Sequence, residues 1–382
     1  MLAAILSITV VGAEEDLSLP DPLTTLAGDR VTTAEQWQQT RRPEVLDLFR
    51  THVYGHTPVA RPDTLRFELK QTDANAMDGM ATLKMVDIHF SGRGGEGVIQ
   101  LAVFVPNAAQ RPAPGFVLIC NRDRSNIDPT REEKSDFWPV ERIVERGYVA
   151  AAFHNSDVDP DHPDGFADGV RGIFAPENES SPDDAWGTIA AWAWGASRVM
   201  DYFETDDDID AARMGVVGHS RGGKASLWCG AEDQRFSLVI SNNSGCSGAA
   251  LARRKQGERV SDINRRFPHW FCGNYEAFNA KEDELPVDQH MLIALMAPRL
   301  VYVASASEDA WADPLGEFLA CAHAGLVYEL LGATGLGVSA MPGTNAPVHL
   351  GRIGYHLREG KHDLTAIDWD HYMDFADKYW GD

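Results

Sequence analysis

Positive charge is scarce in this sequence. Its 382 residues include 34 Lys and Arg against 57 Asp and Glu, which gives a formal net charge of −23. Nucleic acids and anionic lipid surfaces attract proteins through a basic face. We therefore expect neither a nucleic acid nor a membrane among the partners of this chain.

Cysteine is also scarce, and it follows no metal-binding pattern. The chain has five cysteines and no C-x-x-C pair, which argues against a zinc ribbon or a thioredoxin-type redox site. An odd count leaves at least one thiol unpaired within the chain, so we do not expect the fold to depend on disulfides. The five are Cys120, Cys229, Cys246, Cys272 and Cys321.

Long hydrophobic runs are missing too. The run over residues 2–11 is too short to span a bilayer. It ends in Gly12 and Ala13, which is typical of a secretory signal, although no Lys or Arg precedes it. We predict a signal peptide over residues 1–13 and a secreted or periplasmic protein. The alternative is an apolar segment that packs on the rest of the chain.

Internal repeats and low-complexity linkers are absent as well, so residues 14–382 are predicted to form one domain with an N-terminal extension. Residues 64–106 alternate between apolar and polar side chains, which indicates antiparallel strands. Farther along, short unbroken apolar runs predict parallel strands covered by helices on both faces. These runs are residues 116–120, 148–153, 214–217, 238–240 and 300–304. The predicted fold class is α/β.

Helices are indicated between and around these strands. One covers about residues 42–53. A second, residues 185–203, is expected to follow an N-cap at Ser181 and a proline in its first turn. A third begins at Pro314, with Asp313 placed to cap it.

The main chemical signal is G-H-S-R-G at residues 218–222, which fits the pattern G-x-S-x-G. A predicted strand precedes it and a predicted helix follows it, which is the context of a nucleophile elbow. In such a turn Ser220 is exposed and strained, and its flanking glycines let strand and helix approach closely. The alternative is an ordinary glycine-rich turn.

A serine nucleophile needs a histidine base and an acid that orients this base. In folds with this elbow the chain order is Ser, acid, His. His362 lies in a polar turn near the C-terminus and is the predicted base, with His349 and His356 as competitors. His371 is expected to pack in a terminal helix.

The acid is expected in the loop that follows residues 300–304. If Asp313 caps the next helix, Glu308 and Asp309 remain as candidates. We favour Asp309, but spacing along the chain does not separate it from Glu308.

Residues 218–224, G-H-S-R-G-G-K, resemble the G-C/H-S-R-x-G-K signature of the glucuronoyl esterases, carbohydrate esterase family fifteen. The similarity extends over about residues 35–380 through further blocks in the same order: residues 153–159, 243–250, 262–271, 308–314 and 361–363. It implies an α/β-hydrolase fold, a three-layer sandwich with a mostly parallel central sheet and antiparallel strands at its N-terminal edge. It also implies cleavage of the ester between a glucuronoyl group on xylan and a lignin alcohol.

The resemblance assigns roles to single residues. Ser220 would be the nucleophile and His362 the base, and Arg221 would stabilise the oxyanion through its backbone N–H and its guanidinium. Lys224 would bind sugar hydroxyls, and Glu258 and Trp311 would line the uronate pocket. Arg221, Lys224 and Glu258 have an alternative interpretation as surface charges. Trp311 has one as a packing aromatic.

Two positions depart from the fungal members of the family. Asn243 stands where these members have a catalytic Glu, so the acid is expected from the later loop, which supports Asp309. His219 and Asp363 stand where they have two bridged cysteines. We predict that a direct polar contact between His219 and Asp363 replaces this bridge.

The predicted mechanism needs neither a metal nor a cofactor. The acidic stretch at residues 157–164 looks superficially like a calcium loop, but it lacks the required glycine and contains prolines. We expect a monomer that acts on glucuronoxylan or a lignin–carbohydrate ester. The alternatives are a general carboxylesterase or acetyl xylan esterase, and a glucuronoxylan-binding protein without catalysis.

Overall fold

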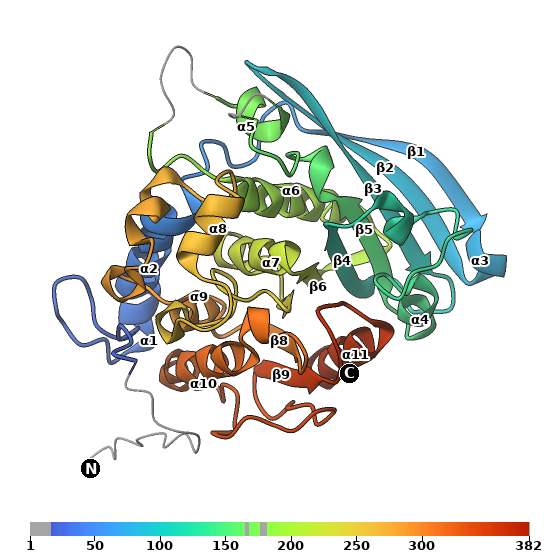
Figure 1. Cartoon of the computed structure of the whole chain (residues 1–382). Helices are drawn as coiled ribbons and strands as arrows, with labels where there is room; N and C mark the ends of the chain where they lie inside the picture. The colour runs from blue at the N-terminus through green and yellow to red at the C-terminus, as the bar shows by residue number, and fades with distance from the viewer. Residues whose placement is uncertain (1–16, 165–167, 176–181, 382) are drawn as a thin grey trace.

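A single sheet of nine strands organises the molecule (Figure 1). The computed structural model describes residues 17–164, 168–175 and 182–381. The predicted signal peptide, residues 1–13, therefore lies outside the described residues. The strand order is β1-β2-β3-β5-β4-β6-β7-β8-β9.

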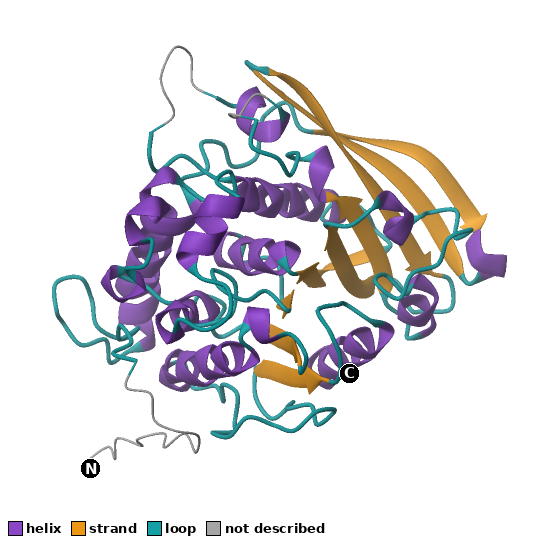
Figure 2. Ribbon diagram, in the orientation of Figure 1, coloured by secondary structure: helices purple, strands orange, loops and turns teal. Residues whose placement is uncertain are grey.

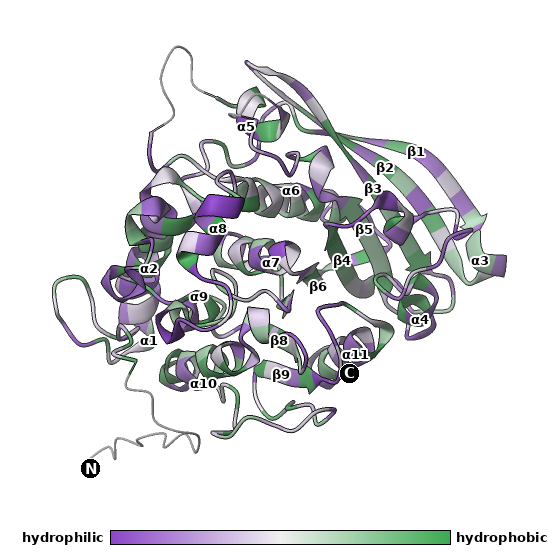
Figure 3. Cartoon of the chain, viewed as in Figure 1, coloured by the Kyte–Doolittle hydropathy of each residue, from purple (hydrophilic) through white to green (hydrophobic). Residues whose placement is uncertain are grey.

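Three long strands form the N-terminal edge of this sheet and run antiparallel, as the alternating pattern predicts (Figure 2). They are β1 (Arg66–Asn75), β2 (Ala81–Gly92) and β3 (Gly95–Pro106). Their alternation is visible as bands of opposite hydropathy in Figure 3. β3 also pairs antiparallel with β5, which joins this edge to the rest of the sheet.

The other six strands are parallel to one another. They are β4 (Ala113–Cys120), β5 (Val149–His154), β6 (Ile209–His219), β7 (Leu238–Asn242), β8 (Leu300–Ala306) and β9 (Ile353–Arg358). Five of the six contain the predicted apolar runs, and β9 was not predicted. The mixed α/β fold with a mostly parallel sheet is thus confirmed.

Helices cover both faces of the sheet and enclose two hydrophobic clusters. One face carries α2 (Arg42–Phe49), α6 (Thr188–Phe203), α7 (Arg221–Glu232), α9 (Gln289–Ala294) and α10 (Pro314–Leu330). The other carries α4 (Val140–Glu145) and α11 (Ala366–Trp380). The shorter helices are α1 (Ala34–Gln36), α3 (Ala76–Gly79), α5 (Gly169–Ile173) and α8 (Val260–Arg266).

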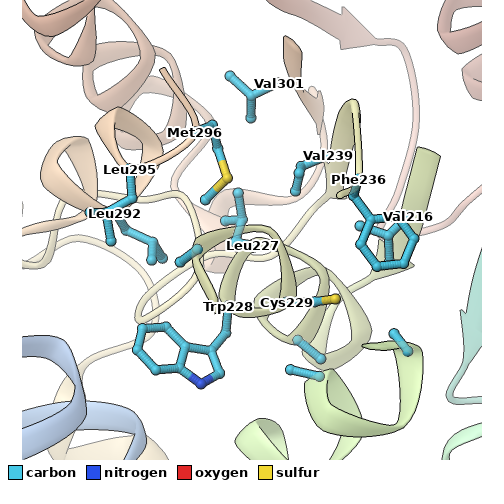
Figure 4. Packing of buried hydrophobic residues seen from close by; sticks show 14 of the residues in the cluster. Val216, Leu227, Trp228, Cys229, Phe236, Val239, Leu292, Leu295, Met296 and Val301 are labelled. Atoms are coloured by element: carbon cyan, nitrogen blue, oxygen red, sulfur yellow. The ribbon is translucent and has the colours of Figure 1, made fainter. Parts of the chain in front are cut away.

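Helix α7 illustrates how the first cluster is built (Figure 4). Its Leu227 is fully buried on the side of Val239 and Met296, while Trp228 points to the other side of the helix and stacks on Tyr54, with ring centroids 4.3 Å apart (Figure 4). Burial of such side chains stabilises the fold by about 1.5–3 kcal/mol each. The helix that begins right after Ser220 is therefore anchored along its length in the protein core.

Helix α6 starts later than predicted, and α10 starts at Pro314 as predicted but without the predicted side-chain cap. Helix α6 begins at Thr188, not at residue 185, because Ala185 forms a β-bridge with His56 and its N–H bonds the Pro182 carbonyl in a turn. The predicted cap Ser181 lies outside the described residues. Asp313 does precede α10, but its carboxylate accepts a hydrogen bond from Arg254 Nε at 2.8 Å and does not cap the helix.

The five cysteines are all free and buried, so none of them forms a disulfide. Within the part of the chain that the structure describes, no helix is long and apolar enough to cross a membrane.

Candidate active site

Ser220 lies in a sharp turn between β6 and α7. Its backbone has φ 56° and ψ −122°, outside the regions that a side chain normally tolerates. A Cβ atom on Gly218 would lie 1.9 Å from the carbonyl oxygen of Gly222, so only glycine permits this approach of strand and helix. Strain of this kind costs about 1–3 kcal/mol and persists where the surrounding structure enforces it. The turn has the geometry expected of a nucleophile elbow.

A cavity of about 290 Å³ opens beside this turn, at the carboxyl ends of β6, β7 and β8. It is lined by all the predicted site residues apart from the alternative acid: Ser220, Arg221, Lys224, Glu258, Asp309, Trp311 and His362. Two larger cavities, of about 340 and 500 Å³, contain none of them.

The imidazole of His362 is paired with Asp309. Its Nδ1 atom lies 2.6 Å from Asp309 Oδ2, and the same oxygen accepts a hydrogen bond from Asn243 Nδ2 at 2.9 Å. Burial works to raise the pKa of Asp309, but the hydrogen bonds from His362 and Asn243 outweigh it and hold this pKa below its usual value. The group beside His362 is thus a carboxylate that can fix the tautomer of the ring.

Glu308 does not share this position. Its side chain is exposed, and its backbone N–H donates to the Gly360 carbonyl at 2.8 Å. The structure therefore brings Asp309, and not the alternative acid Glu308, to the histidine.

The two competing histidines lie elsewhere. His356 is fully buried, with Nε2 2.8 Å from Asp368 Oδ1 and Nδ1 3.0 Å from the Tyr302 hydroxyl. His349 lies 2.9 Å from the same hydroxyl. Neither lines the cavity, and both pack toward helix α11, where His371 also packs.

The predicted direct contact between His219 and Asp363 is wrong. Arg122 lies between them: its Nη2 atom is 2.7 Å from Asp363 Oδ1 and 3.5 Å from His219 Nε2. His219 turns its Nδ1 atom to Asn242 Oδ1 at 2.7 Å, and its ring centroid is 4.5 Å from that of His362. Burial, together with His362 and Arg122, lowers the pKa of His219 to about 3, so its ring is neutral.

Sequence reasoning missed Arg122. The residue follows β4 almost directly, at the carboxyl edge where the other site residues gather. Its position in the topology is a signal that could have identified it.

One wall of the cavity is formed by Lys224, Glu258 and Trp311, which are linked by hydrogen bonds. The buried Lys224 Nζ donates to the backbone carbonyls of Ser244, at 2.7 Å, and Cys246, and to Glu258 Oε2 at 3.1 Å. Glu258 Oε1 accepts a hydrogen bond from Trp311 Nε1 at 3.3 Å. Trp311 keeps 48% of its surface exposed, so an aromatic face remains available to a ligand.

Metal ions are bound in proteins by clusters of His, Cys, Asp or Glu side chains. Among residues 17–164, 168–175 and 182–381, no group of three or more His, Cys, Asp or Glu residues could hold a metal ion.

Comparisons with known proteins identify similar chains. A family model described as "Glucuronyl esterase, fungi" matches residues 178–332. Carbohydrate esterase MZ0003, from an unknown prokaryotic organism, is 42% identical over 95% of this chain and 89% of its own length. A 4-O-methyl-glucuronoyl methylesterase of Schizophyllum commune is 27% identical over 84% of this chain and 76% of its own.

Solved structures of glucuronoyl esterases are also similar to this chain. The glucuronoyl esterase from Solibacter usitatus superimposes with a TM-score of 0.89 at 42% identity. The match covers 95% of this chain and 98% of that one.

Proposed function

Because the chain belongs to the glucuronoyl esterases, carbohydrate esterase family 15, and is a carboxylic ester hydrolase, we propose that it cleaves the ester between a glucuronoyl group of glucuronoxylan and a lignin alcohol. The proposed mechanism uses Ser220, His362 and Asp309 and passes through an acyl-enzyme. The observation that carries it is the 2.6 Å contact between His362 and Asp309 in the same cavity as the strained Ser220.

In the first step Ser220 attacks the ester carbonyl while His362 takes the hydroxyl proton. Asp309 keeps the His362 ring in the tautomer that leaves Nε2 free to accept this proton, and it stabilises the imidazolium that forms. His362 then gives the proton to the leaving alcohol. A water molecule, activated by the same ring, hydrolyses the acyl-enzyme and releases the uronate.

Negative charge develops on the carbonyl oxygen in both steps. The backbone N–H of Arg221, at the start of α7, and the Arg221 guanidinium are the proposed donors. Preorganised donors of this kind are worth about 3–4 kcal/mol each in the transition state. They act locally against the protein's overall charge of −23, which in turn favours departure of the anionic product.

The wall formed by Lys224, Glu258 and Trp311 is the proposed site of the sugar. The Glu258 carboxylate can accept hydrogen bonds from sugar hydroxyls, and the exposed Trp311 ring offers a flat face to a pyranose. The three N–H groups of Lys224 Nζ are taken by Ser244, Cys246 and Glu258, so its proposed part is to hold this carboxylate in place and not to bind hydroxyls itself. These features favour a uronic acid ester over a small acetyl ester, which could contact few of them.

Kinetics on benzyl glucuronate and on matched acetyl esters test this function. We expect a higher kcat/KM on benzyl glucuronate, and loss of turnover with retained glucuronoxylan binding in Ser220→Ala. Faster acetyl-ester cleavage would instead indicate a general carboxylesterase. Binding without turnover by the unaltered protein would indicate a non-catalytic glucuronoxylan-binding protein.

We propose a secreted or periplasmic protein that acts as a monomer and needs no cofactor. Analytical ultracentrifugation of the purified chain tests the monomer.

A further inference from the structure

The acidic side chains of residues 157–164 form ion pairs with different arginines. Asp157, whose side chain is only 7% exposed, pairs with the exposed Arg124 and accepts a hydrogen bond from the Gln100 N–H at 3.1 Å. Asp159 is fully buried and pairs with Arg171 at 2.7 Å. The third acid of the stretch, Asp161, lies behind the catalytic cavity and pairs with Arg221, which lines it.

Three donors converge on the Asp161 carboxylate. Oδ2 accepts from Arg221 Nη1, while Oδ1 accepts from His269 Nε2 at 2.9 Å and from Trp270 Nε1 at 2.8 Å. Burial works to raise the pKa of Asp161, but these hydrogen bonds and the charge of Arg221 lower it to about 2. The group is thus a permanent anion at neutral pH, and its position is fixed from two sides.

Arg221 is held by the same assembly. Its guanidinium carbon lies 4.8 Å from the ring centroid of Trp270 and 5.3 Å from that of Phe267, so an aromatic surface supports the group while Asp161 binds one of its nitrogens. The Nη2 atom makes no hydrogen bond with any residue that the structure describes. Side-chain exposure of 30% leaves the group accessible from the cavity.

We propose that Asp161 is a positioning residue: it anchors Arg221 through Nη1 and thereby presents the N–H groups of Nη2 to the oxyanion. This inference rests on the proposed function, because it assumes that Arg221 stabilises the tetrahedral intermediate. Asp161 itself need not touch the substrate. It prevents the long Arg221 side chain from sampling other rotamers, and small misplacements of a catalytic group can cost about a hundredfold in rate.

The test compares two isosteric substitutions in the same stretch. Asp161→Asn is expected to lower kcat on benzyl glucuronate about 10- to 100-fold with KM changed less than about threefold, because the lost interaction acts in the transition state. Asp157→Asn removes a matched ion pair to Arg124 and is expected to leave both parameters within about twofold. Equal effects of the two variants, or an unchanged kcat in Asp161→Asn, would overturn the proposal.

A double-mutant cycle shows whether Asp161 acts through Arg221. Arg221→Ala alone should lower kcat by about 10²–10³, and adding Asp161→Asn should lower it no further. A merely structural role would give the same additional loss in the Arg221→Ala background, and that result would contradict the inference.

Folding and basal activity are measured separately. Thermal unfolding checks each variant, and if Asp161→Asn does not fold, Asp161→Glu replaces it in the same cycle, because it keeps the charge and shifts it by one methylene. If the unaltered enzyme fails to hydrolyse benzyl glucuronate, the proposed function fails. If that enzyme is active and the cycle is additive, only the role of Asp161 fails.

Discussion

Asp309 Oδ2 lies 2.6 Å from His362 Nδ1 and accepts a second hydrogen bond from the Asn243 amide. The loop after β7, which carries Asn243, and the loop after β9, which carries His362, thus meet at one carboxylate oxygen of the loop after β8. In the fungal pattern the acid comes from the loop after β7, and here that position carries an amide that supports the acid of the loop after β8. The catalytic predictions below follow from this exchange.

Asp309→Asn should lower kcat by roughly 10³–10⁴, because an amide at this position no longer fixes the productive tautomer of His362. Glu308→Gln, one residue earlier and exposed, should stay within about twofold of the unaltered enzyme. Steady-state kinetics on benzyl glucuronate measure both. A larger loss in Glu308→Gln than in Asp309→Asn would reverse the assignment of the acid.

Exchanging the amide and the acid should restore part of the activity. In Asn243→Asp/Asp309→Asn the carboxylate moves to the neighbouring strand end, within one hydrogen bond of its original place. We expect kcat at least about tenfold above that of Asp309→Asn alone, because an acid on either loop can stabilise the imidazolium. No gain over the single variant would show that only the β8 loop can orient His362.

The free energy of unfolding should decrease as pH rises, because Glu317 is buried. This fully buried side chain lies 2.5 Å from Ser305 Oγ and accepts a hydrogen bond from the Gly245 N–H at 2.9 Å. Burial raises its pKa from 4.5 to about 8, with the charge of Asp309 acting in the same direction. Between these two values the folded chain holds a proton that the unfolded chain releases, so the free energy of unfolding decreases as pH rises, by up to about 1.4 kcal/mol per unit.

Denaturant unfolding at several pH values checks this prediction with Glu317→Gln. The stability of this variant relative to the unaltered protein should increase from about pH 5 to pH 8. Glu329→Gln, an exposed change on the same helix, is the control. A pH-independent difference between Glu317→Gln and the unaltered protein would rule the effect out.

Arg122→Met should loosen the loop that carries His362. The change removes the ion pair with Asp363, the contact with His219 and a cation–π contact 4.4 Å from the Phe137 centroid. Because these contacts are partly exposed, we expect the free energy of unfolding to decrease by about 1 kcal/mol. We expect kcat to decrease by about three- to tenfold. Calorimetry and kinetics measure the two effects, with Arg124→Met as the control, and an unchanged kcat would contradict a role in holding the loop.

The parallel strands could be predicted because burial on both faces requires unbroken apolar runs. Strand β9 lacks such a run: Gly354 leaves space for the Tyr302 ring, and His356 is buried only because Asp368 pairs with it. No local pattern reveals a buried histidine whose partner comes from another element.

The candidate site could be predicted in part, as the strands could. The motif around Ser220 marks the serine in the local sequence, but the order of the chain left His349 and His356 as competitors of His362, and only the fold places His362 in the cavity. Asp309 and Glu308 are neighbours, so only the path of the loop decides which of them faces His362. The roles of Arg122 and Asp161 depend on contacts between loops that are far apart in sequence, and no spacing along the chain encodes them.

The salt bridge of Arg122 has a practical consequence. Where the fungal pattern holds its catalytic histidine loop with a covalent sulfur link, this chain uses charge, and its five thiols stay reduced and enclosed. Assembly of the site therefore requires no thiol oxidation and no disulfide exchange. We expect a thiol reductant to leave the activity of the enzyme unchanged.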